Sequence, residues 1–137
     1  MEDNNQKIAL LICRCGTNIA GVIDVDYLVN EFSKYKNVIC YEHEHWCSED
    51  GLLKMREIIK NEKPSRIIIA ACTPHLHEEL FRENAEKVGL NGGYVKVINI
   101  REQCSWVHYQ NPKKATIKAL ELIRGGLAAA PYLNPLR

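Results

Sequence analysis

Six cysteines carry most of the chemistry that this sequence could perform. They are Cys13, Cys15, Cys40, Cys47, Cys72 and Cys104. Thiolates select zinc or iron–sulfur clusters over hard cations such as magnesium. Cysteine is less frequent here than in secreted disulfide scaffolds, and the acidic, polar start 1–6 is unlike a signal peptide. We therefore expect a cytoplasmic protein whose clustered cysteines bind a metal or do redox chemistry.

The composition of the 137-residue chain narrows the class of protein further. Hydrophobic residues make up 46% and charged residues 26% of it, which are ordinary values for one globular domain. The formal net charge of +1 argues against a nucleic-acid partner. The longest apolar runs, Ile8–Cys13 and Ile67–Cys72, have six residues each. A membrane span needs about twenty, so no span is expected.

Strand-like and helix-like runs alternate along the chain. Short apolar runs predict buried strands at 7–13, 38–41, 66–71 and 94–98. Amphipathic runs predict helices at 24–35, at 48–61, from 73 or 74 to a stop at 89, and at 111–130, with a short one near residue 101. This order predicts an α/β fold, in which a mainly parallel four-stranded sheet is flanked by helices in a Rossmann-like or flavodoxin-like three-layer sandwich. We expect a single domain over 1–130, then a tail or the start of a linker at 131–137.

Particular residues are expected to set the ends of these helices. Asp24 and Ser48 are good N-caps, because their side-chain oxygens can accept from the first free backbone N–H groups. Gly89 is a good stop, since glycine readily adopts the left-handed conformation that ends many helices. In the first helix, Tyr27, Leu28 and Phe32 are expected to share one face.

Five of the six cysteines lie at the ends of predicted strands or in the connections that follow them. Cys13 and Cys15 stand at the end of the first strand, Cys47 after the second, Cys72 after the third and Cys104 after the fourth. The carboxyl ends of parallel strands share one edge of the sheet, which is where sites form in such folds. Four connections could thus enclose one soft metal centre. Cys40 lies within the second strand and is expected to pack in the core.

The first connection offers two thiols, although a four-iron cluster usually takes four protein ligands. Cys13 and Cys15 flank Arg14, and we favour Cys15 because it lies further into the loop. Cys13 could pack at the strand end, serve as an alternative ligand or act as a redox thiol. The cysteine spacing matches neither a zinc finger nor a ferredoxin motif, so spatial convergence carries the prediction.

The neighbours of these cysteines are also candidates. His43 and His45 are more simply a polar segment than zinc ligands. Arg14 and Arg101 could donate hydrogen bonds to a negatively charged cluster or form ion pairs. Gly16 permits close backbone approach or a positive φ beside Cys15. His75 could hydrogen-bond near a cluster, and Trp106 and His108 could shield or tune it, or these three could be ordinary core and loop residues.

Four stretches of the chain resemble a known family. They are 13–21 (CRCGTNIAG), 47–51 (CSEDG), 70–75 (AACTPH) and 99–108 (NIREQCSWVH). Together they resemble the N-terminal domain of the A subunit of heterodisulfide reductase (the HdrA-like family), with Thr73 where many relatives are expected to have serine. The resemblance implies a [4Fe-4S] cluster on atypically spaced cysteines and a role in an electron-transfer assembly. It also implies a following FAD-binding domain and ferredoxin-type cluster domains.

The chain lacks the G-x-G-x-x-G fingerprint of dinucleotide-binding domains. FAD is therefore expected only in a partner or in a following domain, with the chain acting as a fragment of a longer protein or as a stand-alone version. We expect no catalytic residue in it. Two other functions remain open: a structural zinc-binding docking module, and a thiol–disulfide redox protein using Cys13, Cys15 or Cys72.

Overall fold

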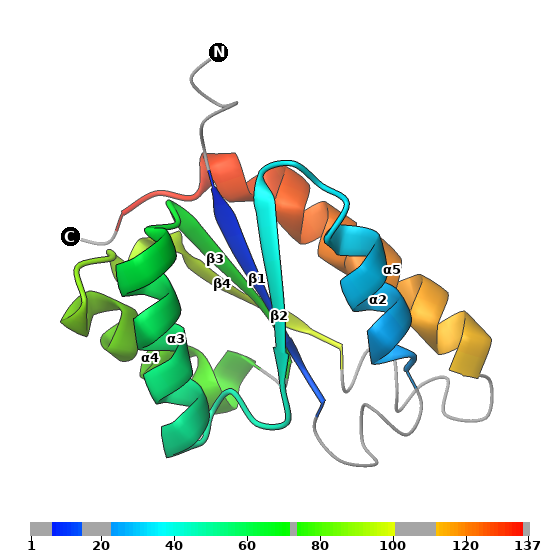
Figure 1. Cartoon of the computed structure of the whole chain (residues 1–137), viewed down its shortest axis with the longest axis horizontal. Coiled ribbons are helices and arrows are strands. Elements are labelled where there is room, and N and C mark those ends of the chain that lie inside the picture. Colours follow the sequence, from blue (N-terminus) through cyan, green and yellow to red (C-terminus); the bar gives the residue numbers. More distant parts are fainter. Residues whose placement is uncertain (1–6, 15–22, 72–73, 101–111, 136–137) are drawn as a thin grey trace.

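A four-stranded parallel sheet forms the centre of the molecule (Figure 1). The computed structural model describes residues 7–14, 23–71, 74–100 and 112–135. The strands are β1 (Ile8–Cys13), β2 (Val38–His43), β3 (Arg66–Ala71) and β4 (Val95–Asn99). Their order is β2-β1-β3-β4, and every neighbouring pair is parallel. The α/β fold expected from the alternating pattern is confirmed.

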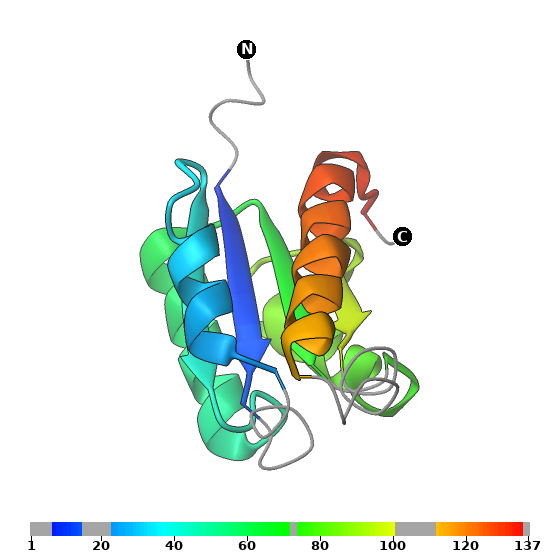
Figure 2. The ribbon, with the colours of Figure 1, turned by 90° about the vertical axis from the view of Figure 1, so that its right-hand side faces the viewer.

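Two helices cover each face of the sheet, which makes three layers (Figures 1 and 2). One face carries α2 (Val25–Phe32) and α5 (Pro112–Ala129), and the other carries α3 (Glu49–Glu62) and α4 (Pro74–Lys87). Short 3-10 turns, η2 (Gly92–Tyr94) and η4 (Ala130–Tyr132), precede β4 and follow α5. In the part of the chain that the structure describes, no helix is both long enough and apolar enough to cross a bilayer.

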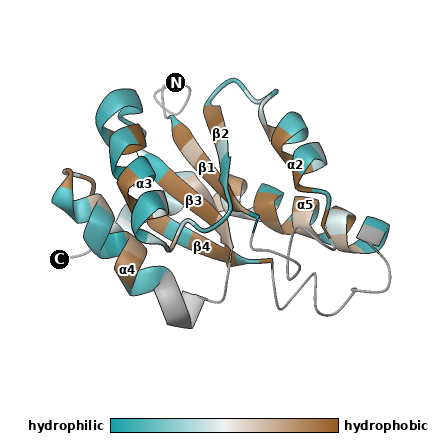
Figure 3. Cartoon of the chain, turned by 60° about the horizontal axis from the view of Figure 1, so that its bottom comes forward, coloured by the Kyte–Doolittle hydropathy of each residue, from teal (hydrophilic) through white to brown (hydrophobic). Residues whose placement is uncertain are grey.

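The apolar core lies on both sides of the two central strands. All six residues of β1 and the last five of β3 are buried, which is expected of strands covered by helices on both faces. Figure 3 shows these strands as hydrophobic and the outer helix surfaces as largely hydrophilic. In the edge strand β2, only Val38 is fully buried.

The predicted N-caps Asp24 and Ser48 and the predicted stop at Gly89 are confirmed. The Asp24 carboxylate accepts from Tyr27 N at 3.0 Å, and the Ser48 hydroxyl accepts from Gly51 N at 3.1 Å. Gly89 has a φ of +95°, and Leu90 N donates to the carbonyl oxygen of Ala85 at 3.0 Å. This left-handed stop satisfies carbonyls that the end of α4 would otherwise leave unpaired.

Three details differ from the sequence-based expectations. Helix α2 ends at Phe32, three residues early, because Lys34 and Tyr35 donate to carbonyls in a tighter turn. Strand β2 extends to His43, since its last residues pair with the end of β1. Tyr27 is 42% exposed and lies outside the buried stripe of α2, which consists of Val25, Leu28 and Phe32. The short helix expected near residue 101 lies outside the described residues.

Candidate metal centre at the carboxyl edge of the sheet

The carboxyl ends of all four strands are in register at one edge. Cys13, the last residue of β1, pairs with His43, the last residue of β2. Ala71 and Asn99 pair in the same way at the ends of β3 and β4, and Ile100 N continues this ladder to the carbonyl oxygen of Ala71 at 3.1 Å. Each strand end thus leads into a segment that carries a predicted ligand.

At this edge, the connections that follow β1 and β3 lead to helices on opposite faces of the sheet (Figure 1). The connection after β1 leads to α2 on one face of the sheet, whereas that after β3 leads to α4 on the other (Figure 1). Such a switch point opens a crevice outside the strand ends, where open α/β sheets bind ligands. In the sequence, Cys15 follows β1 and Cys72 follows β3, so these two cysteines come just after the two strands that flank the switch point.

Two of the five predicted ligands, Cys13 and Cys47, belong to the described residues, and neither forms a disulfide. Several predicted site residues lie outside them, namely Cys15, Gly16, Cys72, Arg101, Cys104, Trp106 and His108. His75 is in the first turn of α4, but its side chain is also outside the described part. Among the described side chains, no three of His, Cys, Asp and Glu converge as a metal site.

Cys13 points into the protein rather than away from the edge. Its side chain is 1% exposed, and its Sγ donates to the carbonyl oxygen of Glu44 at 3.3 Å. Glu44 begins the turn that joins β2 to α3. The thiol therefore packs beneath this turn, which is one of the roles that the sequence left open for it.

Cys47 lies on the same turn, directly before the N-cap of α3. It is half-buried. Glu49 and Asp50 follow in the first turn of the helix, where the helix dipole favours negative charge. A thiolate at Cys47 would gain from the same dipole. This residue fits the role of a metal ligand by donor type and by position.

A buried tryptophan that the sequence analysis did not single out holds this turn in place. Trp46 is 0% exposed, and its indole Nε1 donates to the carbonyl oxygen of Ile12 at 2.9 Å. The ring of His43 lies 5.3 Å from the indole and bonds to Asp50. The sequence signal was the aromatic residue directly before Cys47, but its partner depends on the strand order.

Gly51 lets the turn lie close against α3. A Cβ at this position would come within 2.3 Å of the carbonyl oxygen of His45 and 2.6 Å of Trp46 Cα. Both atoms belong to the backbone, which cannot move aside as the end of a flexible side chain can. A side chain at position 51 would therefore push the Cys47 turn away from the helix.

Arg14 is occupied by ion pairs. Its guanidinium bonds to the carboxylates of Glu42 on β2 and Asp26 on α2. The hydrogen bond that Arg14 donates to Glu42, followed by smaller charge effects of both carboxylates, raises the pKa of Arg14 against the effect of burial. Of the two roles expected for Arg14, the described structure shows the ion pair.

Cys40 packs against the core from the edge strand, away from the carboxyl edge. Burial, together with the charge of Glu42, raises the pKa of its thiol from 9.0 to about 12. A thiol with this pKa stays protonated at neutral pH and is a poor metal ligand. This placement agrees with the packing role expected for Cys40.

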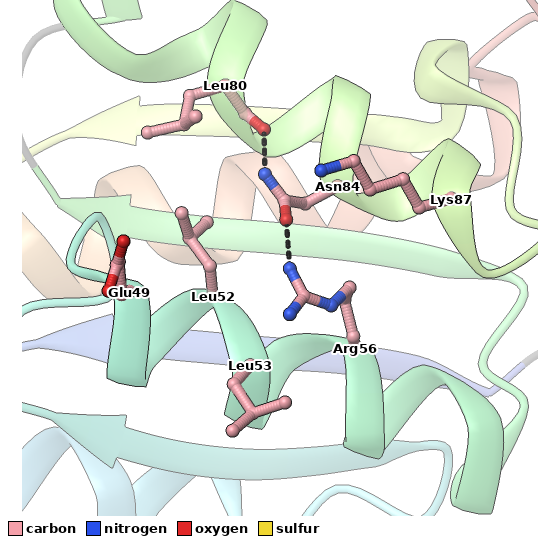
Figure 4. A pocket seen from close by; sticks show the side chains of 7 residues that line it. All are labelled: Glu49, Leu52, Leu53, Arg56, Leu80, Asn84 and Lys87. Atoms are coloured by element: carbon pink, nitrogen blue, oxygen red, sulfur yellow. Dashed lines mark hydrogen bonds between the residues drawn. The ribbon is translucent and has the colours of Figure 1, made fainter.

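The groove between α3 and α4 contains no thiol (Figure 4). Its volume is about 480 Å³. Across it, Arg56 bonds to the Asn84 side chain, whose Nδ2 donates to the carbonyl oxygen of Leu80 at 2.9 Å. These contacts brace the two helices against each other. The carboxyl edge of the sheet remains the candidate site.

The chain is similar over nearly its whole length to part of a known protein. It is 46% identical over 131 residues to the A subunit of the ferredoxin/F420H2-dependent CoB-CoM heterodisulfide reductase of Methanosarcina acetivorans, covering 95% of this chain and 16% of that protein. It is 43% identical over 131 residues to the A subunit of the H2:CoB-CoM heterodisulfide,ferredoxin reductase of Methanothermobacter marburgensis, covering 95% of this chain and 20% of that protein.

A third relative has a name that states its cofactor class. The second of two iron-sulfur A subunits of CoB–CoM heterodisulfide reductase from Methanopyrus kandleri is 41% identical over 138 residues, covering 99% of this chain and 21% of that protein. The chain therefore spans only about a fifth of the relatives that it matches. The resemblance to the A subunit of heterodisulfide reductase is confirmed, at 36–46% identity over about 95% of the chain.

Two further comparisons add no functional argument. No family model matches the chain. The lactose-specific IIB component of a phosphotransferase system from Streptococcus pneumoniae superposes with a TM-score of 0.42 at 16% identity, covering 88% of this chain and 97% of that one. A likeness of this strength supports no conclusion about function.

Proposed function

We propose that this chain, a homologue of one segment of the A subunit of heterodisulfide reductase, is the iron–sulfur electron-transfer part of a related oxidoreductase complex. A [4Fe-4S] cluster is bound by Cys15, Cys47, Cys72 and Cys104. The observation that carries this proposal is the alignment of the four strand ends, each of which leads into one of these cysteines.

The choice of Cys15 over Cys13 is supported by the packing of Cys13. Its Sγ is buried and bonded to the carbonyl oxygen of Glu44, and moving it to a metal would break that contact. Cys15 is two residues further along the chain, past the last residue of β1. Four ligands, one from each βα connection, satisfy a four-iron cluster without a fifth thiolate.

The surroundings of Cys47, the one proposed ligand among the described residues, support such a cluster. Cys47 lies at the amino end of α3, whose dipole offsets part of the charge that four thiolates bring together. Buried apolar side chains directly beneath the edge, among them Ile12 and Trp46, keep water from that side of the site. Lower solvent access and fewer hydrogen bonds to sulfur are two of the ways in which a protein sets a cluster's potential.

A bound [4Fe-4S] cluster accepts one electron and passes it on. Held by Cys15, Cys47, Cys72 and Cys104, it would supply one-electron transfer between a flavin or ferredoxin-type cluster, in a partner protein or a following domain, and a second redox group of the same complex. FAD is bound in that partner or following domain rather than by residues 1–130. Chemistry on any substrate is assigned to that partner or domain too.

Metal analysis of anaerobically purified protein tests this function against a structural zinc module. Iron and acid-labile sulfide in equal amounts, with a brown colour, are expected, and substitution of Cys47, Cys72 or Cys104 by serine is expected to lower both. Colourless protein containing zinc and no iron would establish the zinc module instead. If alkylation of one or two cysteines abolished thiol–disulfide exchange without releasing metal, the protein would be a thiol–disulfide enzyme instead.

A further inference from the structure

The turn between β2 and α3, residues 44–48, is bonded to β1, β2 and α3. We call it the Cys47 turn. Its one fully buried side chain is that of Trp46, whose indole N–H reaches the carbonyl oxygen of Ile12 at 2.9 Å. Ile12 is three residues before Cys15 in the sequence. This hydrogen bond therefore joins the end of β1, which leads to Cys15, to the turn that carries Cys47.

We propose that Trp46 is a positioning residue, which fixes the Cys47 thiol relative to the end of β1 before a cluster binds. This inference rests on the proposed function, because it assigns Cys47 to the cluster. It concerns a different property, namely whether the ligand turn is rigid in the protein without metal. Trp46 acts through the backbone of the next residue and does not itself touch the cluster.

Two other residues, His43 and Cys13, also form hydrogen bonds with the Cys47 turn. The His43 ring accepts a hydrogen bond at Nδ1 from His45 N at 3.0 Å, which leaves Nε2 to bond to Asp50 at 2.9 Å. The ring thereby links the end of β2, the turn and the first residues of α3. From β1, Cys13 donates to the carbonyl oxygen of Glu44. Trp46 differs from these residues, because it is the one fully buried side chain of the turn and it bonds directly to β1.

A ligand held in place before binding costs less to order when the cluster arrives. Replacement of Trp46 by phenylalanine keeps an aromatic side chain but removes the donor to Ile12, and leaves a buried carbonyl oxygen without that partner. The Cys47 turn then has more freedom, while the sheet and α3 remain. We expect the W46F protein to release its iron to a chelator about fivefold to tenfold faster than the wild type.

Alkylation of the protein without metal gives a second readout. Mass spectrometry measures the rate at which iodoacetamide modifies each cysteine. The rate for Cys47 is expected to rise about fivefold in W46F. The Cys40 rate serves as an internal reference, because that thiol lies away from the carboxyl edge. A general loosening of the structure would raise both rates.

The matched control is Phe32→Leu. Phe32 is also aromatic and 0% exposed, but it lies at the end of α2 and is no part of the Cys47 turn. This variant is expected to lower overall stability without changing the alkylation of Cys47. The proposal is supported if W46F alone raises both iron release and Cys47 alkylation. Equal effects of F32L and W46F, or wild-type values in W46F, would overturn it.

The failure of this proposal and the failure of the proposed function can be told apart. Wild-type protein that takes up no iron would overturn the proposed function, and the alkylation of Cys47 in the metal-free protein would still test Trp46. A wild type that binds a cluster, with W46F unchanged in iron release and Cys47 alkylation, would overturn the positioning role alone.

Discussion

The Cys13 thiol donates a hydrogen bond to the carbonyl oxygen of Glu44 at 3.3 Å, and so joins the end of β1 to the Cys47 turn. Cys13 and Cys15 are equivalent candidates by residue type alone. The buried contact of Cys13 separates them, because it gives this thiol a structural partner that a metal ligand would have to abandon.

Substitution by serine is expected to affect these two cysteines differently. The C13S variant keeps a donor for Glu44 and should bind as much iron and sulfide as the wild type, about four of each per chain. The C15S variant loses a ligand and should bind much less. Iron and sulfide analysis with C40S as the unaffected control decides between them; a loss of iron in C13S comparable to that in C15S would make Cys13 a ligand.

Gly51 gives a prediction about stability. In G51A the new Cβ would meet backbone atoms of His45 and Trp46, so we expect a loss of about 1–3 kcal/mol in the free energy of unfolding. Gly125 is the matched control, because it lies exposed in α5 and a Cβ there would meet no atom of a neighbouring element within 4 Å. G125A is expected to raise stability by about 0.5–1 kcal/mol, as alanine favours helix. Urea unfolding measures both, and equal stabilities of G51A and the wild type would refute the close packing.

Much of the fold follows from the sequence, because its local signals agree with one another. A few neighbouring residues were enough to predict each of several features: the apolar runs of β1 and β3, the caps at Asp24 and Ser48, and the stop at Gly89. The contacts of Arg14 and Trp46 were not. They depend on β2 lying beside β1, and strand order is a property of the whole sheet rather than of a local pattern.

The candidate site shows the same division. That five cysteines lie at or after strand ends was visible in the sequence, and the parallel sheet explains why these ends meet. That Cys13 faces inward was not visible, since Cys13 and Cys15 share the same residue type and nearly the same position. The Glu44 carbonyl that distinguishes them is distant in sequence and is brought near only by the β1–β2 pairing.

Cys40 makes stability depend on pH. Its thiol ionises near 9.0 in the unfolded chain, but burial raises its pKa to about 12 in the folded protein. Between these values the folded protein binds more protons than the unfolded chain, so the free energy of unfolding falls as pH rises. In C40A this contribution is absent. The free energy of unfolding, measured at several pH values from 9.0 upwards, should fall more steeply with pH for the wild type than for C40A. An equal fall in the two proteins would exclude the effect.

The contact between Asp24 and Thr116 links the amino ends of α2 and α5. The Thr116 hydroxyl accepts from Asp24 N at 2.8 Å. T116V keeps the side-chain shape but removes this acceptor, and should lower the free energy of unfolding by about 1 kcal/mol. T116S retains the hydroxyl and is the control for the hydrogen bond. If T116V and T116S are equally stable in urea, the hydrogen bond contributes nothing measurable.

The central claim is that four connections at one edge of the sheet hold a single four-iron cluster. Its most direct test is the EPR spectrum of the wild-type chain, purified without oxygen and then reduced, with iron and acid-labile sulfide counted on the same sample. The account predicts a reduced-cluster signal from about four irons and four sulfides per chain. An EPR-silent protein that contains zinc in place of iron would contradict it.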